Sequence, residues 1–337
     1  MRFILVVIFI SAGLMGCQKN NKAPDVSEIK IDLTTLRFEK DLFSLDSLQL
    51  PANLDKLISR YPAFGENFLT TILNTDPHWP ADSATAYIHS FISAYSPLYD
   101  SSQKLFSDFS PYEKQIKKAA QYLHYYFPNY PIPKKIITYI GPLDGFGDIL
   151  DTDAFIVGLH QHLGSNFSMY KTELVRNTYP DYISSRFTPD FIVINCMKNI
   201  VLDMYPEKIA DKTLVVQMVE KGKQIYLLQK LVPFAQQNRL IGFTVKQLKE
   251  SQEREAVIWD LFVQNNFLQS IDNNIIKNYI GESPKTAELG EASPGNIGTF
   301  CGWQIVKKYM DNFPETTLDS LMKTDAEIIF QQAKYKP

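Results

Sequence analysis

The sequence is poor in the residues that bind metals or form disulfide bonds. Of its 337 residues, three are cysteine and five are histidine, and no histidine occurs beyond residue 162. After the first seventeen residues only Cys196 and Cys301 remain, which are too few for a cysteine-based zinc site. The two could pair in an oxidising compartment or stay as buried thiols, because buried cysteine packs like a small hydrophobic residue.

A strong charge imbalance and a second long apolar run are also absent. The net charge is −3 and no basic stripe is visible, which argues against a nucleic-acid-binding protein. After Leu14 no run approaches the ~20 apolar residues that a membrane-spanning helix needs. With 45% hydrophobic and 21% charged residues, the composition is that of an ordinary globular protein.

The common catalytic motifs are missing as well. The sequence contains no Gly-x-Ser-x-Gly elbow, no P-loop and no dinucleotide-binding fingerprint. It also lacks His-Glu-x-x-His, which would place two zinc ligands and a general base on one face of a helix. We therefore expect a protein that is not an enzyme and that carries no cofactor.

The N-terminal segment is the most informative part of the sequence. Arg2 precedes an apolar run from Phe3 to Leu14, and Gly16 with Cys17 closes it. A cation, an apolar stretch and a small residue in this order are typical of a secretory signal. The ending Leu-Met-Gly-Cys resembles a bacterial lipoprotein signal, which implies that residues 1–16 are removed and that Cys17 carries acyl chains such as palmitate. A plain secreted protein and a membrane anchor are the alternatives.

The remainder predicts an α+β fold, mostly helical with a small β-sheet. Residues 17–30 are polar and predict a flexible tether, and residues 31–337 predict one domain. Strands are expected within residues 29–38, 135–140 and 155–159. The last two flank a glycine-rich turn, for which a hairpin is the simplest arrangement. Helical periodicity, proline positions and a Thr244–Gln247 capping box predict helices over residues 52–61, 84–95, 112–127, 189–204, 211–231, from 244, 294–310 and 317–333.

Two histidines and several carboxylates are the candidate metal ligands. His160 and His162 follow an expected strand, and residues two apart on a strand point to one face. They would form half of a zinc site, which would still need a third ligand such as Glu220 or Asp153. The acidic turn, with Asp144, Asp148, Asp151 and Asp153, does not match the spacing of a calcium-binding loop, so solvated carboxylates are the simpler interpretation.

Three glycines begin one of the expected C-terminal helices. Gly298 and Gly302 are four residues apart and hence share a face, and Gly295 precedes them. Glycine costs up to ~1 kcal/mol in a helix relative to alanine, so close packing must offset it. We expect these glycines and Trp303 to serve packing. A helix start that lines a ligand cleft is the alternative, because free amides attract anions.

The run from Ser293 to Met310, SPGNIGTFCGWQIVKKYM, resembles the gliding motility-associated lipoprotein GldB family of Bacteroidetes. Matching pieces are RFEKDLF at Arg37, GKQIY at Gly222, and the C-terminal FQQAKYKP. The resemblance implies a periplasm-facing lipoprotein of the outer membrane that supports gliding motility or type IX secretion by binding a partner protein. The residues after Cys17 lack an acidic cluster of the kind that resembles a surface-export signal, which favours the periplasmic side.

The family is itself similar to zincin-type metallopeptidases, which implies a zincin-like scaffold. The helix at residues 189–204 would replace the metal-binding helix, but it contains neither His nor Glu. The resemblance therefore implies a degenerate peptidase without its metal. A metal-dependent hydrolase rebuilt around His160 and His162 is the rival hypothesis. A carbohydrate-binding lipoprotein that uses exposed aromatics such as Trp79 is a third.

Overall fold

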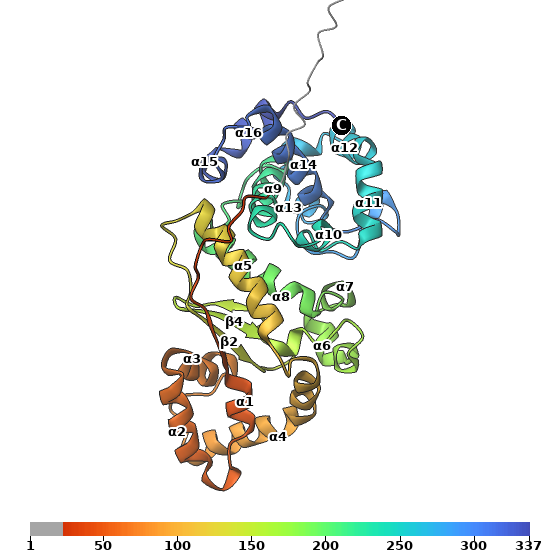
Figure 1. The fold of residues 1–337 in the computed structure, drawn as a ribbon. Coiled ribbons are helices and arrows are strands. Elements are labelled where there is room, and N and C mark those ends of the chain that lie inside the picture. The colour runs from red at the N-terminus through yellow and green to blue at the C-terminus, as the bar shows by residue number, and fades with distance from the viewer. Residues whose placement is uncertain (1–22) are drawn as a thin grey trace, which may run out of the picture.

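The computed structural model describes residues 23–337 (Figure 1). The first helices lie at one end of the molecule, a small sheet with α5 and α8 lies in the middle, and the C-terminal helices form the other end. The signal segment and Cys17 lie outside the described residues. Within the described part, no helix is long and apolar enough to cross a membrane.

The sheet has four strands in the order β1-β2-β4-β3. Strand β2 is parallel to both of its neighbours, β1 and β4, and β3 is antiparallel to β4. The strands are β1 (Thr34–Arg37), β2 (Lys135–Tyr139), β3 (Ile149–Leu150) and β4 (Ala154–Gly158).

The predicted hairpin between β2 and β4 is wrong. Lys135 pairs with Ala154 and Tyr139 with Gly158, so the two strands are parallel. A parallel pair needs a connection of roughly a dozen residues, and residues 140–153 are long enough to carry the chain back to the start of the sheet. The antiparallel partner of β4 is the short β3 within that connection.

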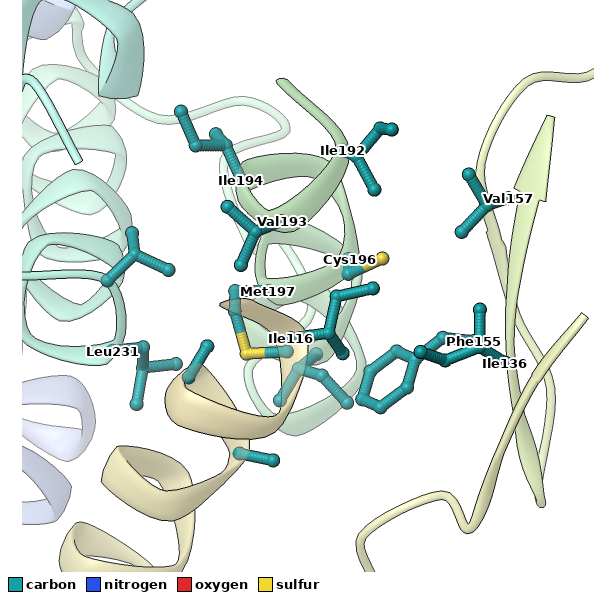
Figure 2. Close-up of a cluster of buried hydrophobic side chains, with 14 of the residues drawn as sticks. Ile116, Ile136, Phe155, Val157, Ile192, Val193, Ile194, Cys196, Met197 and Leu231 are labelled. Atoms are coloured by element: carbon teal, nitrogen blue, oxygen red, sulfur yellow. The ribbon is translucent and has the colours of Figure 1, made fainter. Parts of the chain in front are cut away.

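The two central strands are buried on both faces and separate two hydrophobic cores. Ile136, Phe155 and Val157 face the core that contains α5 and α8, and Ile137 and Ile156 face the core of the N-terminal helices. Neighbouring strand residues point to opposite faces, which explains this division. Figure 2 shows the first core, with Ile192 and Cys196 of α8 turned toward Val157 and Ile194 turned away from the sheet.

The helices match most of the predicted periodic segments. The N-terminal and central helices are α1 (Phe38–Phe43), α2 (Leu50–Arg60), α3 (Pro62–Asn67), α4 (Ala81–Leu105), α5 (Ser110–Tyr126), α6 (Glu173–Thr178), α7 (Asp181–Ser184) and α8 (Ile192–Met204). The C-terminal helices are α9 (Leu214–Leu231), α10 (Gln237–Leu240), α11 (Val245–Glu253), α12 (Glu255–Gln264), α13 (Asn273–Ile276), α14 (Ile297–Asn312), α15 (Leu318–Lys323) and α16 (Ala326–Ala333).

Two helix ends test the capping arguments directly. The capping box at Thr244 is confirmed, because its hydroxyl accepts from the Gln247 amide and the Gln247 side chain accepts from the Thr244 amide. The single helix predicted over residues 317–333 is instead two helices, α15 and α16. Asp325 caps the start of α16 by accepting from Glu327 N, and such side-chain caps compete with a continuous helix.

Helix α9 connects the central and C-terminal cores. Its first half contributes Met218 to the C-terminal core, and its second half contributes Leu228 to the central core. It crosses α14 at a glycine pair: a Cβ on Gly222 would lie 2.2 Å from the Gly302 carbonyl carbon, and one on Gly302 would lie 1.6 Å from the Met218 oxygen. The two backbones are therefore in direct contact, as helices can be only where side chains are absent.

The structure also tests the predicted tether and the two alternatives for the cysteines. Residues 23–30 belong to the predicted tether, yet Val26 is buried and the Ile29 carbonyl accepts from Gln121 Nε2 at 2.7 Å. This part of the chain lies along the body rather than apart from it. Cys196 and Cys301 are both free thiols, and they lie in separate cores, so the disulfide alternative does not hold.

Candidate functional site

The two candidate histidines lie directly after β4, in a 3₁₀ turn (Leu159–Gln161) and at its end. They are therefore not on one strand face, as the sequence analysis assumed. His160 is fully buried and His162 is 1% exposed. Both imidazoles project into the protein and interact with the acidic turn before β4.

Asp148 is the centre of a buried hydrogen-bond network. Its side chain is 3% exposed and its Oδ2 lies 2.9 Å from His162 Nε2. The same carboxylate accepts from Asn195 Nδ2 at 2.8 Å and from Gly158 N at 3.0 Å. Asn199 Nδ2 donates to the Asp148 carbonyl at 3.0 Å. Asn195 and Asn199 are one turn apart on α8, so this face of the helix is bound to the acidic turn.

The surroundings of His162 favour its charged form. Burial disfavours the imidazolium, but the Asp148 carboxylate outweighs this by charge and hydrogen bond, and the pKa of His162 is raised. Nδ1 lies 3.0 Å from the Thr188 carbonyl, which can only accept. Both ring nitrogens therefore donate, and His162 with Asp148 forms a buried ion pair.

His160 is held in the opposite state. Gly141 N donates to Nδ1 at 3.0 Å, so that nitrogen carries no proton, and Nε2 donates to the Phe146 carbonyl at 2.9 Å. Burial lowers the pKa of His160 from 6.5 to about 4. Its neutral ring links the loop after β2 to the acidic turn.

These contacts leave the proposed metal ligands occupied and apart. Every ring nitrogen of His160 and His162 has a protein partner within 3.0 Å. Glu220 lies on α9 and pairs with Lys223 at 2.8 Å, and Asp153 pairs with Lys135 at 2.8 Å. Among residues 23–337, no three His, Cys, Asp or Glu side chains gather as a metal site would require.

A hollow of about 190 Å³ lies beside α8, toward the C-terminal helices. Ile194, Lys198 and Val201 line it from α8, at the spacing of one helix face. The remaining lining comes from five places: α7 and the segment after it (Ile183, Arg186, Phe187, Phe191), α8 itself (Asn195, Leu202), α9 (Gln224, Ile225, Leu228), α10 and the residues after it (Arg239, Leu240, Ile241, Gly242), and the segment between α13 and α14 (Glu282, Asn296).

Cations outnumber carboxylates around this hollow. Arg186 pairs with Glu282 at 2.9 Å, and Arg239 pairs with Asp190 at 2.8 Å. Lys198 forms no ion pair or hydrogen bond with any residue from 23 to 337. Water still reaches its side chain, but the protein atoms that crowd around it and the charge of Arg186 lower its pKa.

Asn195 belongs to both polar regions. Its Nδ2 donates to Asp148, while its side chain also lines the hollow. No described residue donates a hydrogen bond to its Oδ1, and the Gln224 amide has no partner within the described part of the chain. Among residues 23–337, the hollow therefore offers an unpaired cation on Lys198, an unpaired amide oxygen on Asn195 and an unpaired amide on Gln224, together with an apolar lining.

The roles of these residues could be predicted from the sequence only in part. In the sequence, Asp148 is one of four carboxylates expected to be solvated, and Asn195 and Lys198 fall within the helix predicted over residues 189–204, which contains neither His nor Glu. One available signal was the spacing of Asn195 and Asn199, which puts two amides on one helix face.

The glycines and tryptophans singled out from the sequence lie elsewhere. A Cβ on Gly295 would meet the Ser283 carbonyl at 2.0 Å, and one on Gly298 would meet the Tyr279 carbonyl at 2.9 Å. With Gly302 they form close backbone contacts, and Trp303 is fully buried. None of these four lines the hollow. Trp79 is 38% exposed and rests edge-on against Tyr87.

Comparison with known proteins identifies the family. No curated protein and no solved structure matches the chain, so the zincin-like scaffold expected from the resemblance has no support from a known structure. The family model described as gliding motility protein GldB matches residues 19–337, which include the whole described fold. The chain belongs to the gliding motility protein GldB family.

Proposed function

We propose that the protein is a non-enzymatic lipoprotein of the cell envelope that supports gliding motility and the type IX secretion machinery by binding a partner protein. Family membership supports the motility role and the lipid anchor. The observation that carries the binding role is the hollow beside α8, which combines an apolar lining with an unpaired Lys198. Pockets of this composition are the usual sites of ligand recognition.

The groups that could perform chemistry support a binding role. His160, His162 and Asp148 are buried, and each is held by several hydrogen bonds to the protein. A general base must reach the proton that it removes, and these side chains face the interior. A metal site built on the two histidines would have to break the contacts that hold β4 to α8.

The proposed location is the periplasmic side of the outer membrane, with Cys17 as the anchored residue. A cysteine that carries several acyl chains attaches stably, where a single chain would be marginal. The residues from Gln18 to Lys22 lack the acidic cluster that would resemble a surface-export signal. The body would then face the periplasm, where secretion components are within reach.

Crosslinking in the native envelope tests the partner role. We expect the wild-type protein to crosslink to a component of the gliding or secretion machinery. Recovery of the protein without any such component would contradict the proposal. Replacement Cys17→Ala should release a folded protein and abolish gliding, and retained gliding would show that the anchor is dispensable.

Metal analysis tests the absence of enzymatic chemistry. We expect the purified protein to bind less than stoichiometric zinc at neutral pH. Stoichiometric zinc that is lost on His160→Ala would instead favour the rebuilt hydrolase. Urea unfolding of the same variant distinguishes loss of metal from loss of fold.

A further inference from the structure

We propose that the hollow between α8, α9 and α10 binds the C-terminal carboxylate of a partner polypeptide whose last residue is apolar. The inference rests on the proposed function in one respect, namely that the polypeptide belongs to an envelope partner. The charges, volume and lining of the hollow by themselves define the chemistry of the ligand.

The charges around the hollow favour an anionic ligand. Three cations line the hollow (Arg186, Lys198 and Arg239) against one carboxylate, Glu282. The two arginines are already paired, with Glu282 and with Asp190. Lys198 has a positive charge that forms no ion pair with any described residue, so an anionic ligand would provide its partner. A bound anion would also stabilise the charged ammonium of Lys198, which the surrounding protein atoms now disfavour by lowering its pKa.

The size and lining of the hollow suit a single apolar side chain. The volume of about 190 Å³ is smaller than the ~300–1,000 Å³ of pockets that hold drug-sized ligands. It suits one large side chain rather than an extended molecule. Aliphatic and aromatic residues such as Phe187, Leu228 and Ile241 form much of the lining, and all three are buried. An apolar side chain would therefore displace water from apolar surface.

The unpaired acceptors on the hollow favour the end of a peptide over a fatty acid. In a terminal peptide residue the N–H nitrogen is bonded directly to the carbon that bears the carboxylate, whereas a fatty acid has no donor at that position. Asn195 Oδ1 and the Gln224 amide are acceptors on the hollow that have no donor among residues 23–337. An unpaired acceptor beside a cation fits the paired donor and carboxylate of a chain terminus. A bound fatty acid would leave both acceptors unpaired, which is costly once water is displaced.

Peptide binding to the full-length protein in detergent micelles tests the inference. The probe is an N-acetylated tripeptide that ends in phenylalanine, labelled for fluorescence anisotropy, and the comparison is the same peptide with a C-terminal carboxamide. We expect the free acid to bind at least tenfold more tightly, as for the loss of one charge-assisted hydrogen bond. Equal binding of acid and amide would overturn carboxylate recognition.

Variants locate the effect. Lys198→Met keeps the aliphatic stem and should weaken binding of the free acid about tenfold or more, whereas Lys198→Arg should retain most of the affinity. Lys246→Met is the matched control, because that lysine side chain is 76% exposed on α11, and it should leave affinity unchanged. An equal loss in the control, or none in Lys198→Met, would overturn the assignment.

Competition with a fatty acid tests whether the bound carboxylate belongs to a peptide or to a lipid. Decanoate should compete with the labelled peptide at least tenfold more weakly than the unlabelled peptide does. Stronger competition by decanoate would make the site a fatty-acid site and overturn the peptide proposal. Gliding assays distinguish this proposal from the proposed function. If the wild-type protein binds the peptide, Lys198→Met loses that binding and cells with Lys198→Met still glide normally, the hollow is a peptide site that motility does not require. Absence of peptide binding together with crosslinks to the machinery would overturn the peptide site and leave the proposed function standing.

Discussion

Helix α8 has charged groups near two of its sides, and they differ in burial and in pairing. Toward the acidic turn, the Asp148 carboxylate receives hydrogen bonds from His162, Asn195 and Gly158, and its side chain is 3% exposed. On the side of the hollow, Lys198 has no partner within the described residues and water reaches it.

The difference separates a structural role from a binding role. A buried charge must be paired, because an unpaired one costs several kcal/mol. A charge that remains hydrated can stay unpaired and wait for a ligand. We therefore assign the Asp148 network to holding β4, α8 and the acidic turn together, and the Lys198 side to recognition.

The largest expected effect comes from removing the centre of the network. Asp148→Ala would leave the His162 cation buried without its counter-ion and would orphan the Asn195 and Gly158 donors. We expect the free energy of unfolding to fall by about 3–5 kcal/mol, measured by urea denaturation. Asp144→Ala is the control, since that carboxylate is exposed in the same turn and should change stability by no more than about 0.5 kcal/mol. Similar losses in both variants would remove the distinction between the two sides.

The two histidines predict opposite pH dependences. His160 has its pKa lowered to about 4, so between about pH 6.5 and 4 the unfolded chain binds a proton that the folded chain does not, and stability falls as the pH falls. The shift corresponds to about 3 kcal/mol. His162 has a raised pKa, so its contribution is complete below about pH 6.5 and is lost as the pH rises through the folded-state value.

Urea unfolding from pH 4 to pH 9 measures both changes in stability: the fall toward acid pH (the acid limb) and the fall toward higher pH (the alkaline limb). His160→Gln should flatten the acid limb because glutamine does not titrate, while the alkaline limb remains. A wild-type stability that continues to rise below pH 6 would contradict the buried neutral state of His160.

Asn195 should affect both sides, with a smaller loss of stability. Asn195→Ala removes the 2.8 Å hydrogen bond to Asp148, and we expect a loss of about 1–3 kcal/mol. It should also weaken binding of the phenylalanine-ended peptide, because the acceptor on the hollow is lost. Asn199→Ala is the matched comparison: it removes a donor to the Asp148 carbonyl but does not line the hollow. Equal effects on peptide binding would show that Asn195 acts only through the fold.

The smallest effect on stability should come from the recognition side. Lys198→Met should change the free energy of unfolding by no more than about 0.5 kcal/mol, as for other substitutions of unpaired accessible residues. Thermal and urea unfolding of the full-length protein measure this. A loss of 2 kcal/mol or more, the size expected of a buried group, would place Lys198 among the structural residues.

The parts of the fold that follow from neighbouring residues could be predicted from sequence. Helical periodicity located α2, α4, α5, α8, α9 and α14, and the capping box at Thr244 gave the start of α11. The pairing of β2 with β4 could not be predicted in this way, because a glycine-rich connection is compatible with a hairpin and with a parallel return. The break between α15 and α16 depends on the Asp325 cap, which a continuous apolar stripe concealed.

The candidate site was harder to predict because its contacts are distant in sequence. The donors to Asp148 lie 10, 14 and 47 residues away, at Gly158, His162 and Asn195. No local pattern marks a carboxylate that will be buried by three such partners. The same holds for Lys198, whose significance depends on Arg186 and Arg239 having partners of their own.

The contact between α9 and α14 constrains how this chain can change. At Gly222 and Gly302 each residue faces the backbone of the other helix, so a larger residue at one position cannot be accommodated by a smaller one at the other, since both are already the smallest residue available. A single substitution here must move a helix. Because Gln224 and Leu228 line the hollow from the same α9, any such movement would also reshape the binding wall. Single substitutions at Gly222 or Gly302 are therefore not tolerated without a movement of a helix. These two glycines thus maintain the shape of the hollow although neither of them lines it.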